Sequence, residues 1–243
     1  MHTPRHAALV AIFVLFAAAP AAQTRSESRW TFDTSLYCLG AGMTGDVTVH
    51  GVAADLDVGF DDILRNLEFG AMGKVRVGHD RWGLSVDSIY MQLEAAKNGV
   101  SASMDEWVVE PTISYQLTDV LEALVGVRYN SLDGELRGPG VLPSPRIAAS
   151  TEAWWDPIVG AHLSLPLGSA FRAHVRADVG GFGVASDLTW QLFPYVDWRC
   201  ADWFSLQAGY RFYYVDYEDG AGSDRFEWDV LTQGWQMGFT VHF

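Results

Sequence analysis

The sequence predicts an all-β protein, a transmembrane antiparallel up-and-down β-barrel of about ten strands. Apolar and polar residues alternate with a period of two over most of the chain after Trp30. Tight turns and long loops alternate between these segments, and the chain ends at Phe243 on an alternating aromatic segment. Eight or twelve strands are also compatible with the pattern, because strand ends read from sequence carry errors of a few residues.

The first 22 residues have the organisation of a secretory signal peptide. Arg5 precedes an apolar run at 7–19, and Ala19-Pro20-Ala21 forms a small-residue cleavage site. The run is shorter than the roughly 20 residues that a transmembrane helix needs. A buried N-terminal helix is the alternative interpretation. We therefore expect residues 1–22 to be a signal peptide and residues 23–243 to be one barrel domain.

The composition favours a wall that faces lipid and argues against nucleic acid as a partner. Aromatic residues make up 13% of the chain and ten of them are Trp, although no later segment is apolar enough for a helical membrane span. Aromatic girdles at the two interfaces of a barrel account for such an excess. The net charge of −14 would repel a polyanion.

Ten segments follow the period of two, and each is long enough for a tilted membrane strand. A soluble β-sandwich or lipocalin-like barrel is the alternative fold. It explains the alternation of apolar and polar residues, but it does not explain why short turns and long loops follow each other in turn. Tight turns are expected at 79–81, 118–120, 167–169 and 200–202, on the periplasmic side with both termini. The expected strands lie at 30–42, 67–79, 82–94, 104–117, 121–132, 151–166, 170–182, 188–199, 203–217 and 226–243.

The C-terminal segment, Trp235-Gln-Met-Gly-Phe-Thr-Val-His-Phe243, resembles the assembly signal of bacterial outer-membrane proteins. Trp235, Phe239, Val241 and Phe243 carry this resemblance, since they alternate on one face and end on Phe. The resemblance implies that the barrel-assembly machinery recognises this strand and inserts the chain into the cell outer membrane.

Residues 30–243 as a whole resemble the small Gram-negative outer-membrane β-barrel proteins of the OmpA- and OmpW-type group, and within it a poorly characterised subfamily. The segments that carry the resemblance are Asp61–Leu67, Trp82–Tyr90, Asp178–Gln191 and Gly209–Arg211. The resemblance implies a porin-like barrel in contact with outer-membrane lipid and lipopolysaccharide. It implies no established activity.

A set of charged residues lies opposite the apolar stripes. An Arg or Lys that faces lipid at the membrane midplane costs roughly 2–4 kcal/mol, so we expect the set to face the lumen. There, opposite charges can pair and share hydrogen bonds. The expected lumen set is Asp33, Lys74, Arg76, Asp87, Glu110, Glu122, Arg128, Asp156, His162, Arg172, His174, Arg176, Asp178, Asp197, Arg199 and Arg211.

The lumen set favours a mostly plugged barrel. The side chains of an eight-stranded barrel just fill its interior, so ten strands leave little spare room, and large Arg and Tyr side chains close most of it. A narrow polar or gated pore and a ligand site are the alternatives.

Two candidate catalytic patterns were compared with known outer-membrane enzymes. His162 and Ser164 form an H-x-S pair like that of lipid A deacylases, but alternation places both in the lumen, away from acyl chains. His174 and Asp178 share a face, but they lack the spacing and the aspartate pair of ten-stranded outer-membrane proteases. The sequence therefore predicts no enzyme activity, and we expect no cofactor.

The two cysteines, the acidic loops and one stretch rich in Pro and Gly are expected to lie without a bound metal or a disulfide. Cys38 and Cys200 could form a disulfide, but two free, packed thiols are favoured. Loops near 43–66 and 218–225 are rich in Asp and Glu, which attract divalent cations, although a solvated loop without a metal is favoured. The stretch 138–145 is a surface loop by its Pro and Gly content.

A short helix is expected at 60–67, capped by Asp61 or Asp62. Ile63, Leu64 and Leu67 would share one side of it. The helix would either cover the mouth of the barrel or pack as part of a loop without such a role.

The sequence thus predicts a monomeric integral outer-membrane barrel with an ion-paired lumen and a structural or surface-interaction role. A narrow porin-like channel for ions or small polar solutes is the second hypothesis, and an outer-membrane hydrolase is the third.

Overall fold

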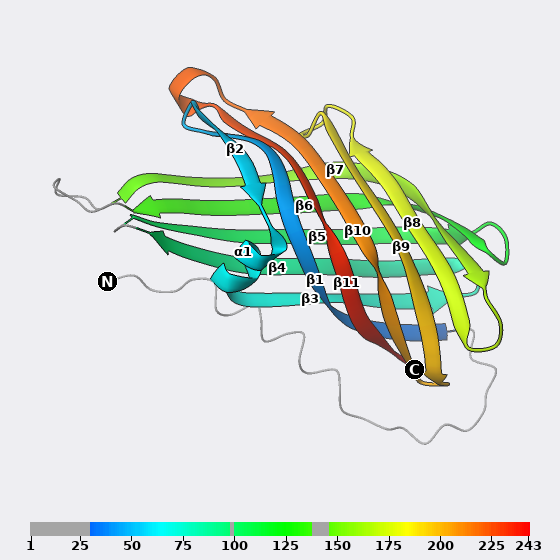
Figure 1. The fold of residues 1–243 in the computed structure, drawn as a ribbon. Coiled ribbons are helices and arrows are strands. Elements are labelled where there is room, and N and C mark those ends of the chain that lie inside the picture. Colours follow the sequence, from blue (N-terminus) through cyan, green and yellow to red (C-terminus); the bar gives the residue numbers. More distant parts are fainter. Residues whose placement is uncertain (1–29, 98–99, 138–145) are drawn as a thin grey trace.

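The computed structural model describes residues 30–97, 100–137 and 146–243 (Figure 1). The expected signal peptide lies outside these residues, as does the proposed surface loop at 138–145. Within the described ranges the helical elements are α1 (Phe60–Asn66) and the 3-10 turn η2 (Gly222–Asp224). The strands are β1 (Trp30–Val49), β2 (Val52–Val58), β3 (Leu67–His79), β4 (Trp82–Lys97), β5 (Val100–Gln116), β6 (Leu121–Arg137), β7 (Arg146–Pro166), β8 (Phe171–Gly181), β9 (Leu188–Ala201), β10 (Phe204–Asp219) and β11 (Phe226–His242).

The strands form a closed antiparallel barrel. Consecutive strands from β3 to β11 pair with one another, β3 also pairs with β1, and β11 pairs back to β1 from Asp33–His242 to Thr48–Glu227. The Phe243 N–H donates to the Phe32 carbonyl at 2.9 Å, so the chain end is part of this closure. In the described part of the chain, ten strands form the wall and β2 stands outside the circle, beside β1. The predicted fold class is confirmed.

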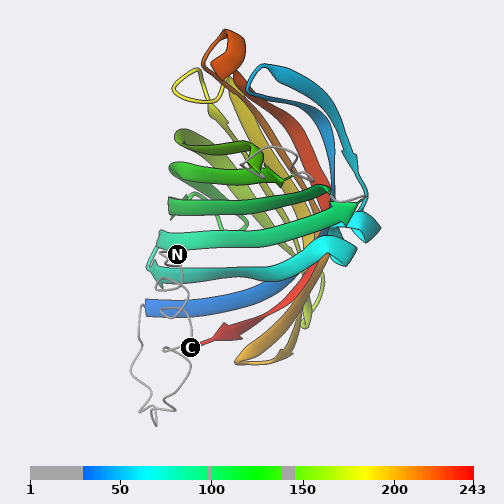
Figure 2. The same ribbon diagram turned by 90° about the vertical axis from the view of Figure 1, so that its left-hand side faces the viewer.

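The strands extend farther than the sequence predicts at the end with the long loops. β1 continues to Val49 instead of residue 42, and it forms a hairpin with β2 inside the expected loop at 43–66. The β10–β11 hairpin rises beside it, and the Gly51 N–H donates to the Arg225 carbonyl at 3.0 Å (Figures 1 and 2). These extensions were missed because the alternation of apolar and polar residues weakens where no face meets lipid. At the opposite end, Cys200 belongs to β9 rather than to a turn.

The element that lies next to β1 on one side changes along the length of the strand. β1 pairs with β3 only from Trp30–His79 to Leu36–Gly73, and β2 takes this side of β1 from Met43–Val58 upward. α1 lies against β1 and β4 between these two stretches, at the edge of the wall rather than across the mouth (Figure 2). The Phe60 ring lies close to Gly40, and a Cβ at this position would be 2.8 Å from it, so a larger residue would require the ring to move.

The short helix forms as predicted, but its expected cap is wrong. Gly59 is the N-cap residue, and no side chain caps the helix. Ile63 is buried, whereas Leu64 is 55% exposed. The predicted apolar side is therefore divided between the interior and the outer surface, because the helix sits in a wall with two faces.

The outer surface of the barrel carries a continuous apolar belt between two aromatic rims. Within the described residues, no helix is long and apolar enough to cross a membrane. Exposed aromatic residues near the tight turns are Trp30, Trp82, Phe171, Trp198, Trp203 and Phe243, and those near the other rim are Phe69, Trp155, Phe182 and Trp235. Exposed aliphatic residues between them are Leu36, Leu84, Ile113, Val125, Val127, Val159, Leu165, Val175, Val179, Leu192, Val196, Leu206 and Met237.

Candidate functional site

The lumen is filled in three successive layers. Nearest the long hairpins lies an apolar layer. Below it lies a layer of paired charges that we call the ionic plug, and a cavity opens at the end with the tight turns. The apolar layer includes Met43, Ile89, Met91, Val108, Leu132, Trp154, Val215, Tyr217, Phe226, Trp228 and Val230. The sequence predicted a charged lumen throughout, and this apolar layer is the main difference.

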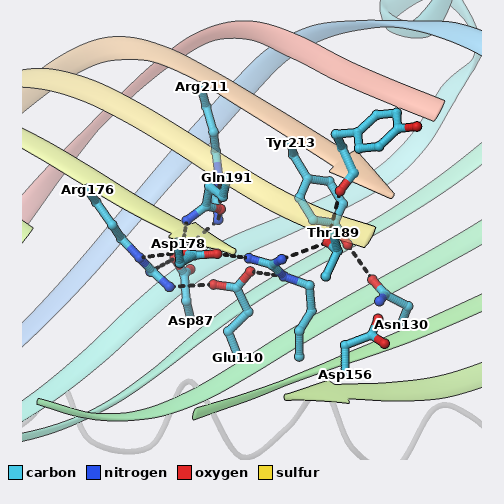
Figure 3. Close-up of polar contacts among 12 residues, drawn as sticks. Asp87, Glu110, Asn130, Asp156, Arg176, Asp178, Thr189, Gln191, Arg211 and Tyr213 are labelled. Carbon is cyan, nitrogen blue, oxygen red and sulfur yellow. Dashed lines mark hydrogen bonds and ion pairs between the residues drawn. The ribbon is translucent and has the colours of Figure 1, made fainter. Parts of the chain in front are cut away.

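Arg128 is the centre of the ionic plug, and Figure 3 labels its partners Glu110, Asp178 and Thr189. Its side chain is 0% exposed and projects inward from β6. It donates to Glu110 Oε1 on β5 at 2.6 Å, to Asp178 Oδ1 on β8 at 2.6 Å and to Thr189 Oγ1 on β9 at 2.8 Å. Its guanidinium also lies 4.9 Å from the centre of the Tyr213 ring. One side chain thereby connects four strands across the lumen.

Two further arginines complete the ionic plug. Arg176 donates to Glu110 Oε2 at 2.7 Å, and it lies 3.6 Å from Asp87 Oδ2. Its Nε is 3.3 Å from Asp178 Oδ2 but is not aligned for a hydrogen bond. Arg211 donates to Gln191 Oε1 at 2.8 Å and to the Tyr37 hydroxyl at 3.2 Å. The Tyr37 hydroxyl in turn donates to Asp87.

The charges of the ionic plug balance. Its three guanidiniums belong to Arg128, Arg176 and Arg211, and its three carboxylates belong to Asp87, Glu110 and Asp178. All six residues belong to the lumen set expected from sequence. Sequence analysis missed the neutral members Tyr37, Thr189, Gln191 and Tyr213, although each alternates on the lumen face of its strand and could have been found there.

Asp156 lies apart from the guanidiniums of the plug. Its carboxylate accepts hydrogen bonds from the Ser186 N–H at 2.8 Å, the Ser186 hydroxyl at 2.6 Å and the Trp154 indole at 3.1 Å. It therefore fastens the β8–β9 loop into the lumen. A second carboxylate, that of Glu106, was absent from the expected set, and its Oε2 is buried without a hydrogen-bond partner among the described residues.

Below the plug, a cavity of about 600 Å³ occupies the lumen. It extends to turn residues such as Arg81 and Asp119, so it opens toward the side that carries the chain end. Other members of the expected lumen set line it: Asp33, Lys74, Arg76, Glu122, His162, Arg172, His174, Asp197 and Arg199. The side chains of the apolar layer and the ionic plug thus occupy part of the lumen, and this cavity occupies the rest.

Several charges of the cavity wall are paired. Arg76 binds Glu122 through two hydrogen bonds of 2.6 and 3.1 Å, and the Ser114 hydroxyl donates to the same carboxylate at 2.6 Å. His242 Nδ1 lies 2.7 Å from Asp33 Oδ1 across the β1–β11 closure. Arg76 therefore compensates the charge of Glu122, and Asp33 has a histidine as its neighbour.

Two of the histidines that line the cavity, His162 and His174, stack on one wall. His162 Nε2 lies 3.1 Å from His174 Nδ1 and 3.2 Å from the Tyr195 hydroxyl, and His174 stacks on Tyr195 with ring centres 4.5 Å apart. The Ser164 hydroxyl accepts from Arg172 at 3.3 Å. His162 Nε2 is thus directed at His174 and Tyr195, and the hydrolase pair of His162 and Ser164 is not assembled.

Asp178 belongs to the plug, so the compared pair of His174 and Asp178 is also separated. His174 lies in the cavity below, and Asp178 is engaged by Arg128 and Gln191. Neither pattern considered from the sequence brings together a nucleophile and a base.

The outer face of the two long hairpins carries a transverse row of four carboxylates, which we call the acidic row. Asp55 lies opposite Asp46, Asp46 opposite Asp229, and Asp229 opposite Asp216, on four neighbouring strands. The nearby loop residue Arg225 donates to Glu218 at 2.9 Å, which raises the pKa of the guanidinium. In the described ranges, no group of three or more His, Cys, Asp or Glu side chains is arranged to hold a metal ion.

The two cysteines lie on the outer surface. Both are free, but they are exposed rather than packed as predicted. Cys38 and Cys200 alternate with lumen residues on their strands, so their side chains leave the wall on the lipid side.

Comparison with known proteins gives structural similarity alone. No family model matches the chain, and no curated protein does. Among solved structures, Ail, the attachment invasion locus protein of Yersinia pestis, is 9% identical with a TM-score of 0.38, covering 89% of this chain and 99% of Ail. Neisserial surface protein A is 11% identical with a TM-score of 0.34, covering 89% and 98%. The NanC porin is 8% identical with a TM-score of 0.35, covering 86% and 98%.

The location of the protein follows from its own wall. The spanning strands pair with one another around a closed circle, so their backbone groups bond mainly within the wall, as a chain in hydrocarbon requires. Its apolar belt between aromatic rims has the organisation of an outer-membrane wall, with tight turns at one end and long hairpins at the other. The chain is an integral β-barrel of the cell outer membrane.

Proposed function

We propose that this barrel is a non-conducting outer-membrane protein with a structural or surface-interaction role, and that the ionic plug closes its lumen. The observation that supports this most strongly is the complete burial of Arg128 and its direct bonds to three other strands. A hydrated pore along the axis would have to pass through these bonds.

The apolar layer adds a second barrier above the plug. Trp154 stacks on Tyr217 with ring centres 3.9 Å apart, and Val215 and Val230 beside them are nearly inaccessible to solvent. An ion that loses its hydration shell in this layer meets mostly apolar side chains, among which Glu106 and Asn130 are polar. Conduction would therefore require both layers to rearrange.

The long hairpins are the surface on which the proposed interaction role rests. They project beyond the aromatic rim and carry the acidic row on their outer face. Contacts with outer-membrane lipid and lipopolysaccharide, a monomeric state and insertion by the barrel-assembly machinery are parts of the same proposal.

Planar-bilayer recording tests the closed lumen. The purified barrel is expected to give no sustained conductance steps, because the plug and the apolar layer leave no hydrated path. Regular ion-selective steps from the unmodified protein would contradict the proposal and would favour a narrow pore.

A further inference from the structure

The cavity below the ionic plug contains a lysine without a partner. Among the described residues, Lys74 makes neither a hydrogen bond nor an ion pair within 4.0 Å. Its strand neighbour Asp87 is occupied by Tyr37, Arg176 and Arg211. The fully buried polar atoms that lack a partner do not include the ammonium group of Lys74. This group is therefore accessible, and it contacts the cavity. We propose that the periplasm-facing cavity binds a small molecule through an oxyanion group, a phosphate or a carboxylate, held by Lys74.

The carboxylates near Lys74 are engaged by arginines. The charges that act on it most strongly are those of Arg176, Asp87, Arg76 and Glu122. The two arginines are paired with these carboxylates, at 3.6 Å for Arg176 and Asp87 and at 2.6 Å for Arg76 and Glu122. Lys74 is therefore the uncompensated cation at the inner end of the cavity, and a bound anion would neutralise it.

Two further cations lie on the way from the periplasm to Lys74. Arg172 bonds to the Ser164 hydroxyl, and Arg199 bonds to the Asp202 carbonyl at 2.6 Å, so each is held by a neutral oxygen. Neither has a carboxylate within 4.0 Å among the described residues, although Asp197 also lines the cavity. Positive groups that are spaced along a cleft concentrate anions and guide them inward.

The remaining wall supplies the features of a small-molecule site. A cavity of about 600 Å³ has the size of pockets that hold metabolite-sized ligands. The stacked rings of His174 and Tyr195 offer a flat face, and Gln207, Gln236 and Thr240 offer neutral hydrogen-bonding groups. The ligand class that fits is a small polar molecule with one terminal oxyanion. The proposal goes beyond the closed lumen and does not depend on it, because the cavity lies entirely below the plug.

Histidine-ring NMR of the folded protein in detergent micelles tests the site. Sodium phosphate and sodium acetate are titrated separately at constant ionic strength, with sodium chloride as the reference anion. We expect saturable shifts of the His162 and His174 ring resonances, while His50 at the opposite end stays unchanged. A stronger response to phosphate would assign phosphate-bearing molecules, and a stronger response to acetate would assign carboxylates.

The variant Lys74→Gln should weaken the binding by about tenfold or more, as expected for the loss of one charge-assisted hydrogen bond. Lys74→Arg, which keeps the cation, should retain it, and Arg225→Gln controls for net charge. Heat-modifiable migration in electrophoresis verifies that each variant is folded. The proposal is overturned if neither anion gives a saturable shift beyond that of chloride, or if Lys74→Gln binds as well as the unmodified chain.

Discussion

Arg128 illustrates how a full positive charge is kept in the interior of a membrane barrel. The guanidinium loses all contact with water, and the loss is offset by two carboxylates and one hydroxyl at 2.6–2.8 Å. Burial of an ion pair is close to neutral overall, but removal of one partner leaves a buried charge without compensation. The plug should therefore respond far more to single substitutions than to paired ones.

At this scale, Arg128→Met is expected to destabilise the barrel by about 3–5 kcal/mol, because Glu110 and Asp178 lose their shared cation. The double variant Glu110→Gln with Arg128→Met should lose less than the sum of the two single variants, since one uncompensated carboxylate is also removed. Urea unfolding in vesicles, followed by tryptophan fluorescence, measures both values.

Arg225→Met provides the matched comparison for that experiment. Arg225 is 40% exposed and pairs with Glu218 and Glu227 at a hairpin end. An exposed pair contributes roughly 0–1 kcal/mol. Equal losses for Arg128→Met and Arg225→Met would show that the plug does not hold the strands together.

The sequence indicated which side chains face the lumen, but not the level along the barrel axis at which each of them lies. Alternation was sufficient to direct Glu110, Arg128 and Asp178 toward the lumen. The offset between neighbouring strands decides which of these side chains meet, and it is set by pairs such as Val109–Tyr129, which no single strand reveals. Alternation alone therefore does not distinguish Lys74 and Asp156 from the charged residues that pair with one another.

Among the elements, the two long hairpins depart most from the pattern of the barrel. They place like charges directly opposite each other in the acidic row, an arrangement that destabilises a strand pair. The backbone ladder holds them together despite this repulsion. The hairpins are therefore less stable than their hydrogen bonds alone would make them.

Neutralising the middle of the acidic row should stabilise both hairpins. Asp229 faces a carboxylate on each side, so Asp229→Asn removes two repulsions. We expect slower hydrogen exchange of hairpin amides, by an amount that corresponds to about 0.2–1 kcal/mol, and a smaller gain at high salt. Asp119→Asn, in a periplasmic turn, controls for net charge. Unchanged exchange at low salt would indicate that solvent already screens the row.

The short helix shows what local sequence can and cannot determine about an element. Its position followed from the spacing of apolar residues, but its cap did not, because Asp62 bonds to Arg65 within the helix instead of capping it. The division of Ile63 and Leu64 between two environments depends on where β1 leaves β3, which is a property of the whole wall.

On the scale of the whole molecule, the chain end completes the cylinder. The Phe243 ring lies 5.4 Å from that of Phe32, and the backbone of Phe243 bonds to the same residue. Trp235 and Phe239 face outward on the same strand. Recognition of this strand by the assembly machinery is implied by the resemblance of its sequence and stays a prediction.

Deletion of Phe243 tests that prediction. The truncated chain should accumulate outside the outer membrane and lose heat-modifiable migration, since it lacks both the terminal aromatic residue and its bond to β1. Trp203→Ala removes an exposed aromatic residue of the same rim and should insert normally. Normal insertion of the truncated chain would contradict the assigned role of the C-terminal residue.

The unequal pairing of β1 has a mechanical consequence. On one side β1 is joined to β11 over Asp33–Thr48, whereas on the other it is joined to β3 only over Trp30–Leu36. Separating two strands sideways breaks their hydrogen bonds one after another. Less work is therefore needed to separate the pair that has fewer hydrogen bonds. A circumferential load would open the cylinder between β1 and β3, beside α1, while the joint between the two ends of the chain would remain intact.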